Sequence, residues 1–259
     1  MSISKNNILQ QLTATLLDQS FIVDEQESIE MYQEMVASYV KIDQCVGILS
    51  DFQANCSYIF SGSFGQVFGL AADNTVIDSA FEEAIFSKIH PDDIIERHVL
   101  ELNYFQFQKR INQKERSRYS TFSRIRVQNS DGSYTYINHR TIYVKSLPNG
   151  SVWLAFCIYA PATDLIPNKG IDGKIIDVQT GEVIAYEKYA GTSKNLLSQR
   201  ELEILTLVAK GMGSKQIAKE LHIAVHTVYR HRQNIIEKMK VANTAEAVKT
   251  AVVMGIISL

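Results

Sequence analysis

The chain of 259 residues is 46% hydrophobic and 21% charged, which is the composition of an ordinary globular protein of one or two domains. Its longest apolar runs reach about half of the roughly 18–20 residues that cross a membrane, and its first residues lack the apolar stretch of a signal peptide. We therefore expect a cytoplasmic protein with no membrane partner. Residues 191–259 carry ten Lys and Arg against five Asp and Glu, whereas the rest of the chain has a net charge of −7. A basic segment joined to an acidic one is typical of a protein in which one end meets phosphate.

The first 60 residues predict two helices followed by two strands. In residues 7–17 and 25–39, apolar residues recur every three or four positions without Gly or Pro, which indicates amphipathic helices. Two short apolar runs, residues 45–49 and 56–59, predict strands. A stretch punctuated by Gly follows them and predicts a short helix with turns.

Two further helices are predicted on either side of the sequence His90-Pro91-Asp92-Asp93. Residues 78–89 predict a helix because four apolar residues would share one of its faces: Phe81, Ala84, Ile85 and Ile89. The tetrapeptide ends that helix and begins another, since Pro suits the first turn and the two acids favour a helix N-terminus. We expect this second helix to run to about Gln113.

Three strands with polar turns between them come next, in residues 121–127, 134–144 and 152–159. The turns are Asn129–Gly132 and Leu147–Gly150, which have the residue types of tight hairpins. The third strand is apolar throughout, which predicts a central position. The order predicts an α+β fold: an antiparallel sheet with helices on one face.

A small hairpin is predicted in residues 174–178 and 182–186, followed by a polar linker in residues 187–195. We therefore divide the chain into N-terminal helices, a sheet domain, a hairpin with linker, and an all-α domain of four helices, with the bounds 1–37, 38–165, 166–192 and 193–259.

The last domain predicts a helix-turn-helix. Ser198 and Glu201 form a capping box at the start of its first helix, and Gly211 and Gly213 end that helix. Ser214 is expected to cap the second helix. A turn at residues 222–224 leads into a third helix at about 225–240, and Asn243 caps a fourth.

The third helix has a basic, polar face opposite its apolar face. At about 100° per residue, Ile235 and Met239 fall beside Val228 and would be buried with it. The opposite side carries groups that can bind base edges in the major groove of duplex DNA: His226, Tyr229, Arg230, Gln233 and Glu237.

This segment resembles the LuxR-type helix-turn-helix family. The residues that carry the resemblance are Leu197, Arg200, Glu201, Ala209, Gly211, Ile217, Ala218, Leu221, Ile223, Thr227, Val228, His231, Asn234, Ile235, Lys238, Met239 and Val241. The resemblance implies base contacts by Tyr229, Arg230 and Gln233, and phosphate contacts by Lys215, His226, Thr227, Arg232, Asn234 and Lys238. The chain departs from the family at Ala224, where a Ser usually caps the reading helix, and at Tyr229, where Lys is common.

Residues 38–162 resemble a PAS domain in their order of two strands, helices and three strands, with the tetrapeptide at 90–93 before the long helix. The resemblance implies a sensory or dimerisation domain. No cofactor is predicted, and a small-molecule ligand in this domain is left open. His90 is expected to cap the helix beside Pro91 rather than to bind haem.

Two other classes of function are disfavoured. Neighbouring residues of a helix point about 100° apart, so Asp92 and Asp93 cannot easily flank one substrate atom, and we expect no enzyme, catalytic residue or metal site. The three cysteines have no metal-binding or disulfide spacing.

The prediction is a transcriptional regulator that binds duplex DNA as a homodimer, with RNA polymerase as a further candidate partner. A protein-interaction adaptor or a sigma-like factor with the same helix-turn-helix is the alternative.

Overall fold

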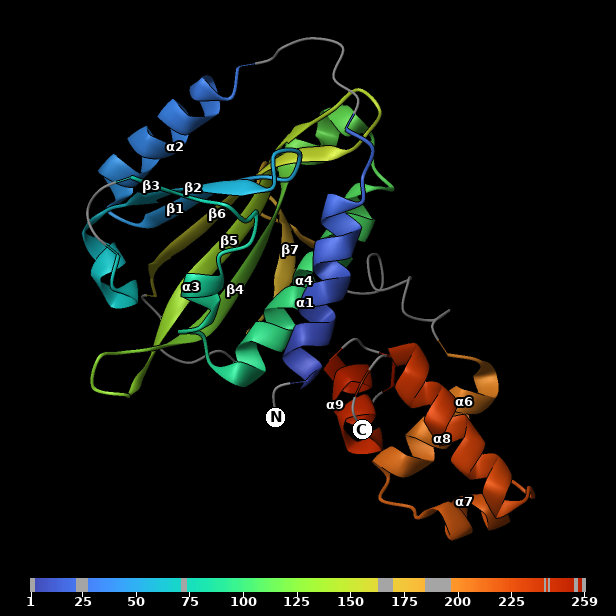
Figure 1. The fold of residues 1–259 in the computed structure, drawn as a ribbon. Helices are drawn as coiled ribbons and strands as arrows, with labels where there is room; N and C mark the ends of the chain where they lie inside the picture. Colours follow the sequence, from blue (N-terminus) through green and yellow to red (C-terminus); the bar gives the residue numbers. More distant parts are fainter. Residues whose placement is uncertain are drawn as a thin grey trace. The chain divides into compact units, whose positions relative to one another are not determined.

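The computed structural model describes residues 3–21, 28–70, 74–162, 170–184, 197–239, 241, 243–253 and 256–257. Contacts divide the chain into two compact units, residues 11–185 and residues 186–259 with 1–10. The first unit is an α+β structure built on an antiparallel sheet, and the second is helical (Figure 1). The predicted linker at residues 187–195 lies outside the described residues, and the predicted domain bounds stay predictions.

Within the described residues, eight strands form one sheet in the order β3-β2-β1-β6-β5-β4-β7-β8, and each neighbouring pair is antiparallel. The predicted hairpin forms as β7 and β8, and β7 pairs with β4, so the hairpin extends the sheet. Pairing of the hairpin with β4 was not predicted. The bounds are β1 (Val46–Asp51), β2 (Cys56–Ser61), β3 (Thr75–Ile77), β4 (Tyr119–Gln128), β5 (Tyr134–Ser146), β6 (Val152–Pro161), β7 (Lys174–Asp177) and β8 (Val183–Ile184).

The predicted three-strand meander is confirmed. Both of its turns close with a backbone hydrogen bond, from Gly132 N to Asn129 O at 3.1 Å and from Gly150 N to Leu147 O at 2.8 Å. Each glycine has a positive φ, 83° and 86°, a region that L-residues with a Cβ rarely adopt. The third strand, β6, lies between β1 and β5, and its first eight residues are buried, as its continuous apolar sequence predicted.

Helices cover both faces of the sheet, which corrects the prediction of helices on one face. α2 (Glu30–Asp43) packs Val36 and Val40 against the face that carries Phe156. On the opposite face, Tyr104 of α4 (Pro91–Gln108) stacks on Tyr143 of β5, with 4.6 Å between ring centroids. The physical reason was present in β6: a strand that is apolar at every position must be covered on both sides.

The helix predicted for residues 78–89 is wrong. Within this range the chain forms only one short helix, α3 (Glu83–Phe86), and the edge strand β3 ends just before it, at Ile77. Side chains fix the backbone in between, because Asn55 Oδ1 accepts from Ala80 N at 3.1 Å and Ser79 Oγ accepts from Phe81 N at 3.1 Å. Ala84, which the prediction placed on the buried face, is exposed.

The remaining helical segments agree with their predictions in position and differ in length. α1 (Ile3–Leu17) and the 3-10 helix η1 (Ser63–Phe68) form where helices were predicted. α4 ends at Gln108, five residues short of the predicted Gln113. A separate 3-10 helix, η2 (Gln113–Arg118), begins beyond it because Asn112 Oδ1 accepts from Lys114 N at 3.1 Å and caps the new turn.

The tetrapeptide at the start of α4 has a structural role. His90 Nδ1 accepts from Asp92 N at 3.2 Å, so His90 caps the helix as predicted, and Pro91 is its first residue. The Asp93 carboxylate is buried and accepts from Arg126 N at 2.8 Å and from Arg126 Nε at 3.0 Å. Asp93 therefore joins α4 to β4.

Candidate nucleic-acid interface

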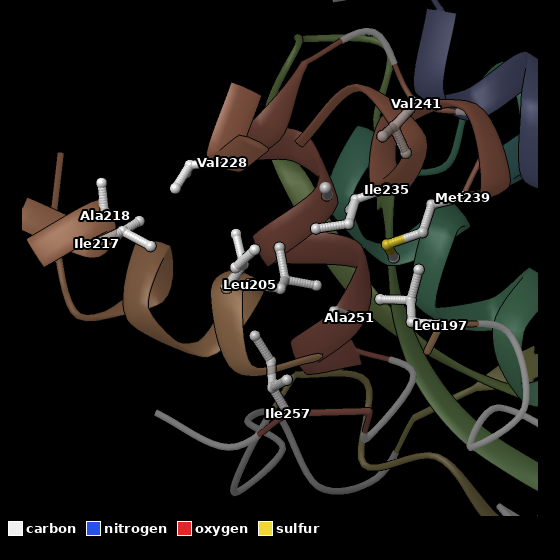
Figure 2. Close-up of a cluster of buried hydrophobic side chains, with 12 residues drawn as sticks. Leu197, Leu205, Ile217, Ala218, Val228, Ile235, Met239, Val241, Ala251 and Ile257 are labelled. Carbon is white, nitrogen blue, oxygen red and sulfur yellow. The ribbon is translucent and has the colours of Figure 1, made fainter. Parts of the chain in front are cut away.

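The helical unit contains α6 (Gln199–Ala209), α7 (Ser214–Glu220), α8 (Val225–Met239) and α9 (Thr244–Val253). Figure 2 shows side chains from all four helices converging on one apolar core. The three residues predicted for the buried face of α8, Val228, Ile235 and Met239, are in that core. The core comprises Leu197, Ile204, Leu205, Ile217, Ala218, Val228, Ile235, Met239, Val241, Ala247, Ala251 and Ile257.

The start of α6 has the predicted capping box. Ser198 Oγ accepts from Glu201 N at 3.3 Å, and Ser198 N donates to Glu201 Oε2 at 2.7 Å. Lys238 of α8 also binds Glu201 Oε2, with its Nζ at 2.7 Å. Burial raises the pKa of Glu201, but the hydrogen bonds from Lys238 and Ser198 outweigh it and hold that pKa below its ordinary value. The N-terminal cap of α6 is thereby joined to α8.

The turn between α6 and α7 differs from the prediction at one residue. Gly211 has φ of 83° and donates from its N to Val208 O at 2.9 Å, which ends α6 as predicted. Ser214 does not cap α7, because the N-cap is Gly213, whose N donates to Gln216 Oε1 at 2.8 Å. Glycine at the cap position leaves the Ser214 hydroxyl inside the first turn, where it is available to α8.

The turn between α7 and α8 is held by backbone geometry. His222 adopts φ of 51°, and Ile223 N donates to Ala218 O at 3.0 Å. Arg200 of α6 donates from Nη2 to Leu221 O at 3.0 Å, so a side chain binds a carbonyl at the end of α7. The sequence singled out Arg200 only through its place in the family pattern. Ala224 offers α8 a backbone carbonyl, which accepts from Thr227 N at 3.0 Å.

The side of α8 that the sequence predicted to face outward is exposed to solvent. Tyr229 is 58% exposed, and His226, Arg230 and Gln233 are exposed as well. Gln233 Nε2 lies 3.4 Å from Glu237 Oε1, one turn further along. Among the described residues, the Arg230 guanidinium has no hydrogen-bond or ion-pair partner. The three predicted base-contact residues thus share a solvent-facing surface.

The predicted phosphate-contact residues divide into two groups. Lys215 is exposed in the first turn of α7, and His226 and Thr227 lie in the first turn of α8, Thr227 being half-buried. Asn234 is also half-buried. A helix N-terminus favours anions through its free N–H groups and its dipole, so the first turn of α8 can bind phosphate.

The other group, Arg232 and Lys238, already binds side chains inside the helical unit. Arg232 Nη1 donates to Ser214 Oγ at 2.9 Å, and its Nε donates to Thr244 Oγ1 at 3.2 Å. Arg232 therefore joins α8 to the first residues of α7 and α9. Lys238 binds Glu201, as described above.

Within the described ranges, no three His, Cys, Asp or Glu side chains come together as a metal site requires. In the same part of the chain, every helix is too short or too polar to pass through a lipid bilayer.

Residues 195–251 match the family model of bacterial regulatory proteins, luxR family. Over 56 residues, the chain is 46% identical to the oxygen regulatory protein NreC of Staphylococcus carnosus, covering 22% of this chain and 26% of that protein. Over 68 residues, it is 43% identical to the uncharacterized response regulatory protein YgeK of Escherichia coli, covering 26% of this chain and 46% of that protein. The chain thus spans less than half the length of these curated relatives.

A solved structure of the phage VqmA–DPO complex aligns over 90% of this chain and 94% of its own, with 17% identity and a TM-score of 0.30. This score is too low to establish a common fold. The family match rests instead on the C-terminal helices. The matched residues, 195–251, contain the capping box, the glycine turn and α8. The C-terminal segment, residues 195–251, is a LuxR-type helix-turn-helix domain.

Proposed function

We propose that the chain is a sequence-specific DNA-binding transcriptional regulator whose reading helix, α8, enters the major groove. The observation that carries the proposal is the exposed face of α8, with Tyr229, Arg230 and Gln233 on a scaffold of the luxR family. A major groove accepts an α-helix, and the N-terminal part of a reading helix contacts the base edges. All three residues lie in the first nine positions of α8.

Each base-contact residue has chemistry that suits a base edge. Arg230 can donate two parallel hydrogen bonds to guanine O6 and N7, and Gln233 can pair with adenine N6 and N7. Tyr229 presents a ring and a hydroxyl beside them. Lys215, His226 and Thr227 fix the register by binding the phosphate backbone, and Asn234 lies about two turns further along α8. For Arg232 and Lys238 we propose positioning as the first role, because their side chains already hold α8 in place.

A single reading helix offers few base contacts, so we propose a homodimer on a two-fold symmetric site. Each copy would place one α8 in the major groove, with half-sites about one DNA turn apart. The basic helix-turn-helix segment would supply most of the attraction to phosphate, since the rest of the chain is acidic.

We propose the α+β unit as a PAS-like sensory or dimerisation domain. The order β2-β1-β6-β5-β4 within its sheet, with helices between β2 and β4, supports this assignment. The buried polar atoms that lack a hydrogen-bond partner among the described residues include three from the sheet: the hydroxyls of Tyr143 and Tyr159 and Nε2 of His139. Unpaired buried polar groups are costly, and they are the groups that a small polar ligand would bind.

The test is the selection of a DNA site from a random library, followed by affinity measurements on two variants. Arg230→Ala should weaken binding to the selected site by roughly 10- to 150-fold and relax selectivity at one base pair. Lys215→Ala should weaken all sequences alike and reduce the slope of log affinity against log salt by about one. Lys88→Ala, an exposed lysine of the α+β unit, is the charge-matched control.

Two results would contradict the proposal. Failure to select any DNA sequence, or an Arg230→Ala variant with unchanged selectivity, would favour the protein-interaction adaptor. Selection only in the presence of RNA polymerase core would favour a sigma-like factor.

A further inference from the structure

One helix of the α+β unit carries large apolar side chains on its solvent side. On α2, Met31 is 54% exposed, Met35 59%, Tyr39 39% and Ile42 86%. The buried positions Val36 and Val40 of the same helix already pack on the sheet. Scattered apolar residues on a surface are ordinary, but four on one helix of 14 residues form a stripe.

The spacing along the stripe is that of a helix–helix seam. Met31, Met35, Ser38 and Ile42 are separated by four, three and four residues, which is the alternation of a heptad. At about 100° per residue, Met31, Met35 and Ile42 fall within an arc of about 40°. Ser38, at the edge of that arc, is small enough to let a second helix approach closely. The seam is therefore suited to another helix.

Charged residues beside the seam select the direction of that second helix. Glu34 and Lys41 lie on the same edge of the stripe, seven residues apart, and both are exposed. Among the described residues, neither has an ion-pair partner. If two copies of α2 pair antiparallel, Glu34 of each copy comes opposite the partner's Lys41, so two ion pairs form about one axis. Parallel pairing would instead place the acidic N-terminal halves of the two helices, each with Glu30 and Glu34, side by side.

We propose that α2 is the dimer interface of the regulator, formed by antiparallel packing of α2 against α2 of a second copy. The inference rests on the proposed homodimer and adds the surface that forms it. Met31 would face the partner's Ile42, and Met35 would face the partner's Ser38. The contact is self-complementary, as a two-fold interface requires, and opposed helix dipoles favour it.

The interface can be tested by charge reversal in the full-length chain. Glu34→Lys places two lysines opposite each other, Lys41→Glu places two glutamates opposite each other, and the double variant restores both ion pairs. We expect each single variant to raise the dimer dissociation constant about tenfold, and the double variant to return it to the wild-type value. Sedimentation velocity across a dilution series measures that constant. Within one chain the two residues are two turns, about 10 Å, apart, so rescue cannot come from an ion pair inside one helix.

A second variant tests the apolar seam. Met35→Glu should raise the dissociation constant by roughly a hundredfold, because a carboxylate would be buried in the seam of each copy. Val178→Glu, which alters a residue 46% exposed beyond β7, should leave it unchanged. The fluorescence of Trp153, the one tryptophan of the chain, reports whether each variant keeps the α+β unit folded.

Three outcomes would overturn the interface: a wild-type chain that is monomeric free and on DNA, folded single variants that dimerise as wild type does, or a double variant no better than either single one. The proposed DNA binding is judged separately, from the selectivity of Arg230→Ala. A dimer broken at α2 with base selectivity intact would support both proposals. If the protein dimerises through α2 but its base selectivity does not depend on Arg230, the proposed DNA reading by α8 would fail and the α2 interface would stand.

Discussion

Arg230 and Arg232 lie two positions apart on α8, and the structure uses their side chains differently. Arg230 is exposed on the same side of the helix as Tyr229 and Gln233. Arg232 is half-buried and donates to Ser214 and Thr244, which begin the neighbouring helices. A rotation of about 200° separates the two side chains, so one faces solvent and the other faces the scaffold. Charge alone therefore does not identify a DNA contact.

At the residue scale, Ser198→Ala should loosen α6. The variant removes the hydroxyl that accepts from Glu201 N, and loss of such a cap costs about 1 kcal/mol. Amide hydrogen exchange of α6 should then be roughly fivefold faster, as measured by mass spectrometry of peptides from this helix. Gln199→Ala, at the next position and without a capping bond, is the control and should exchange as wild type. Equal rates in the two variants would show that the capping box does not stabilise α6.

His139 should make the α+β unit less stable in mild acid. Burial, together with the charges of Arg97 and His98, lowers its pKa well below the ordinary 6.5. The ring stacks near Tyr159 and contacts Ser123 Oγ through Nδ1 at 3.3 Å. Because the unfolded chain takes up a proton near pH 6.5 and the folded chain does not, stability is present above that pH and falls below it.

Urea denaturation followed by Trp153 fluorescence measures this effect. Between pH 7 and 5, the free energy of unfolding should decline with a slope that approaches about 1.4 kcal/mol per pH unit. His139→Asn should flatten the slope, whatever its effect on absolute stability. His226→Asn, in the helical unit, should leave the slope unchanged. An identical slope in wild type and His139→Asn would mean that another group takes up the proton.

At the scale of elements, α8 is held by polar contacts at its middle and near its C-terminal end, as well as by its apolar face. Arg232 joins it to the starts of α7 and α9, and Lys238 joins it to the capping box of α6. These contacts fix the position of α8, and so they also fix the position of its exposed side chains. The first residue of α7 contributes because its N-cap is a glycine, which leaves Ser214 to bind Arg232.

Arg232→Met should therefore weaken the domain before DNA is present. Loss of two hydrogen bonds from a charged group should speed amide exchange in the first turns of α7 and α9 by roughly tenfold or more. Arg230→Met is the matched control, since it removes the same charge two positions away from an exposed site. Unchanged exchange in Arg232→Met, with a salt dependence of DNA affinity reduced by about one, would instead make Arg232 a phosphate contact.

At the scale of the whole molecule, the two compact units differ in net charge. Residues 191–259, which include α8, have a net positive charge, while the remainder, which includes the sheet and α2, has a net negative charge. Repulsion between phosphate and the acidic unit would confine the DNA to the helical unit of each copy. In the proposed dimer, two α8 helices presented together would raise the affinity for a two-fold symmetric site.

The spacing of half-sites tests this arrangement. Five base pairs inserted between the half-sites of a selected site should weaken binding by roughly tenfold or more, because the second half-site then faces the opposite side of the duplex. Ten inserted base pairs should recover part of the loss. Fluorescence anisotropy with labelled duplexes measures both, and a duplex with one half-site is the reference. Equal affinity for all spacings would show that the two helices bind independently.

The sequence by itself determined the features that depend on neighbours within a few positions. The Ser198–Glu201 box, the end of α6 at Gly211 and the outward side of Tyr229, Arg230 and Gln233 follow from local capping and from 100° per residue. The three-strand meander followed from alternation and turn residues in the same way. These predictions needed no knowledge of distant contacts.

The tertiary structure decided what depends on residues far apart in the chain. It reduced the helix predicted for residues 78–89 to the short α3, added β7 and β8 to the sheet, and covered both faces of β6. It also directed Arg232 to Ser214 and Lys238 to Glu201, 18 and 37 positions away. Helix periodicity gives the direction of a side chain, but only packing between elements determines which group it meets.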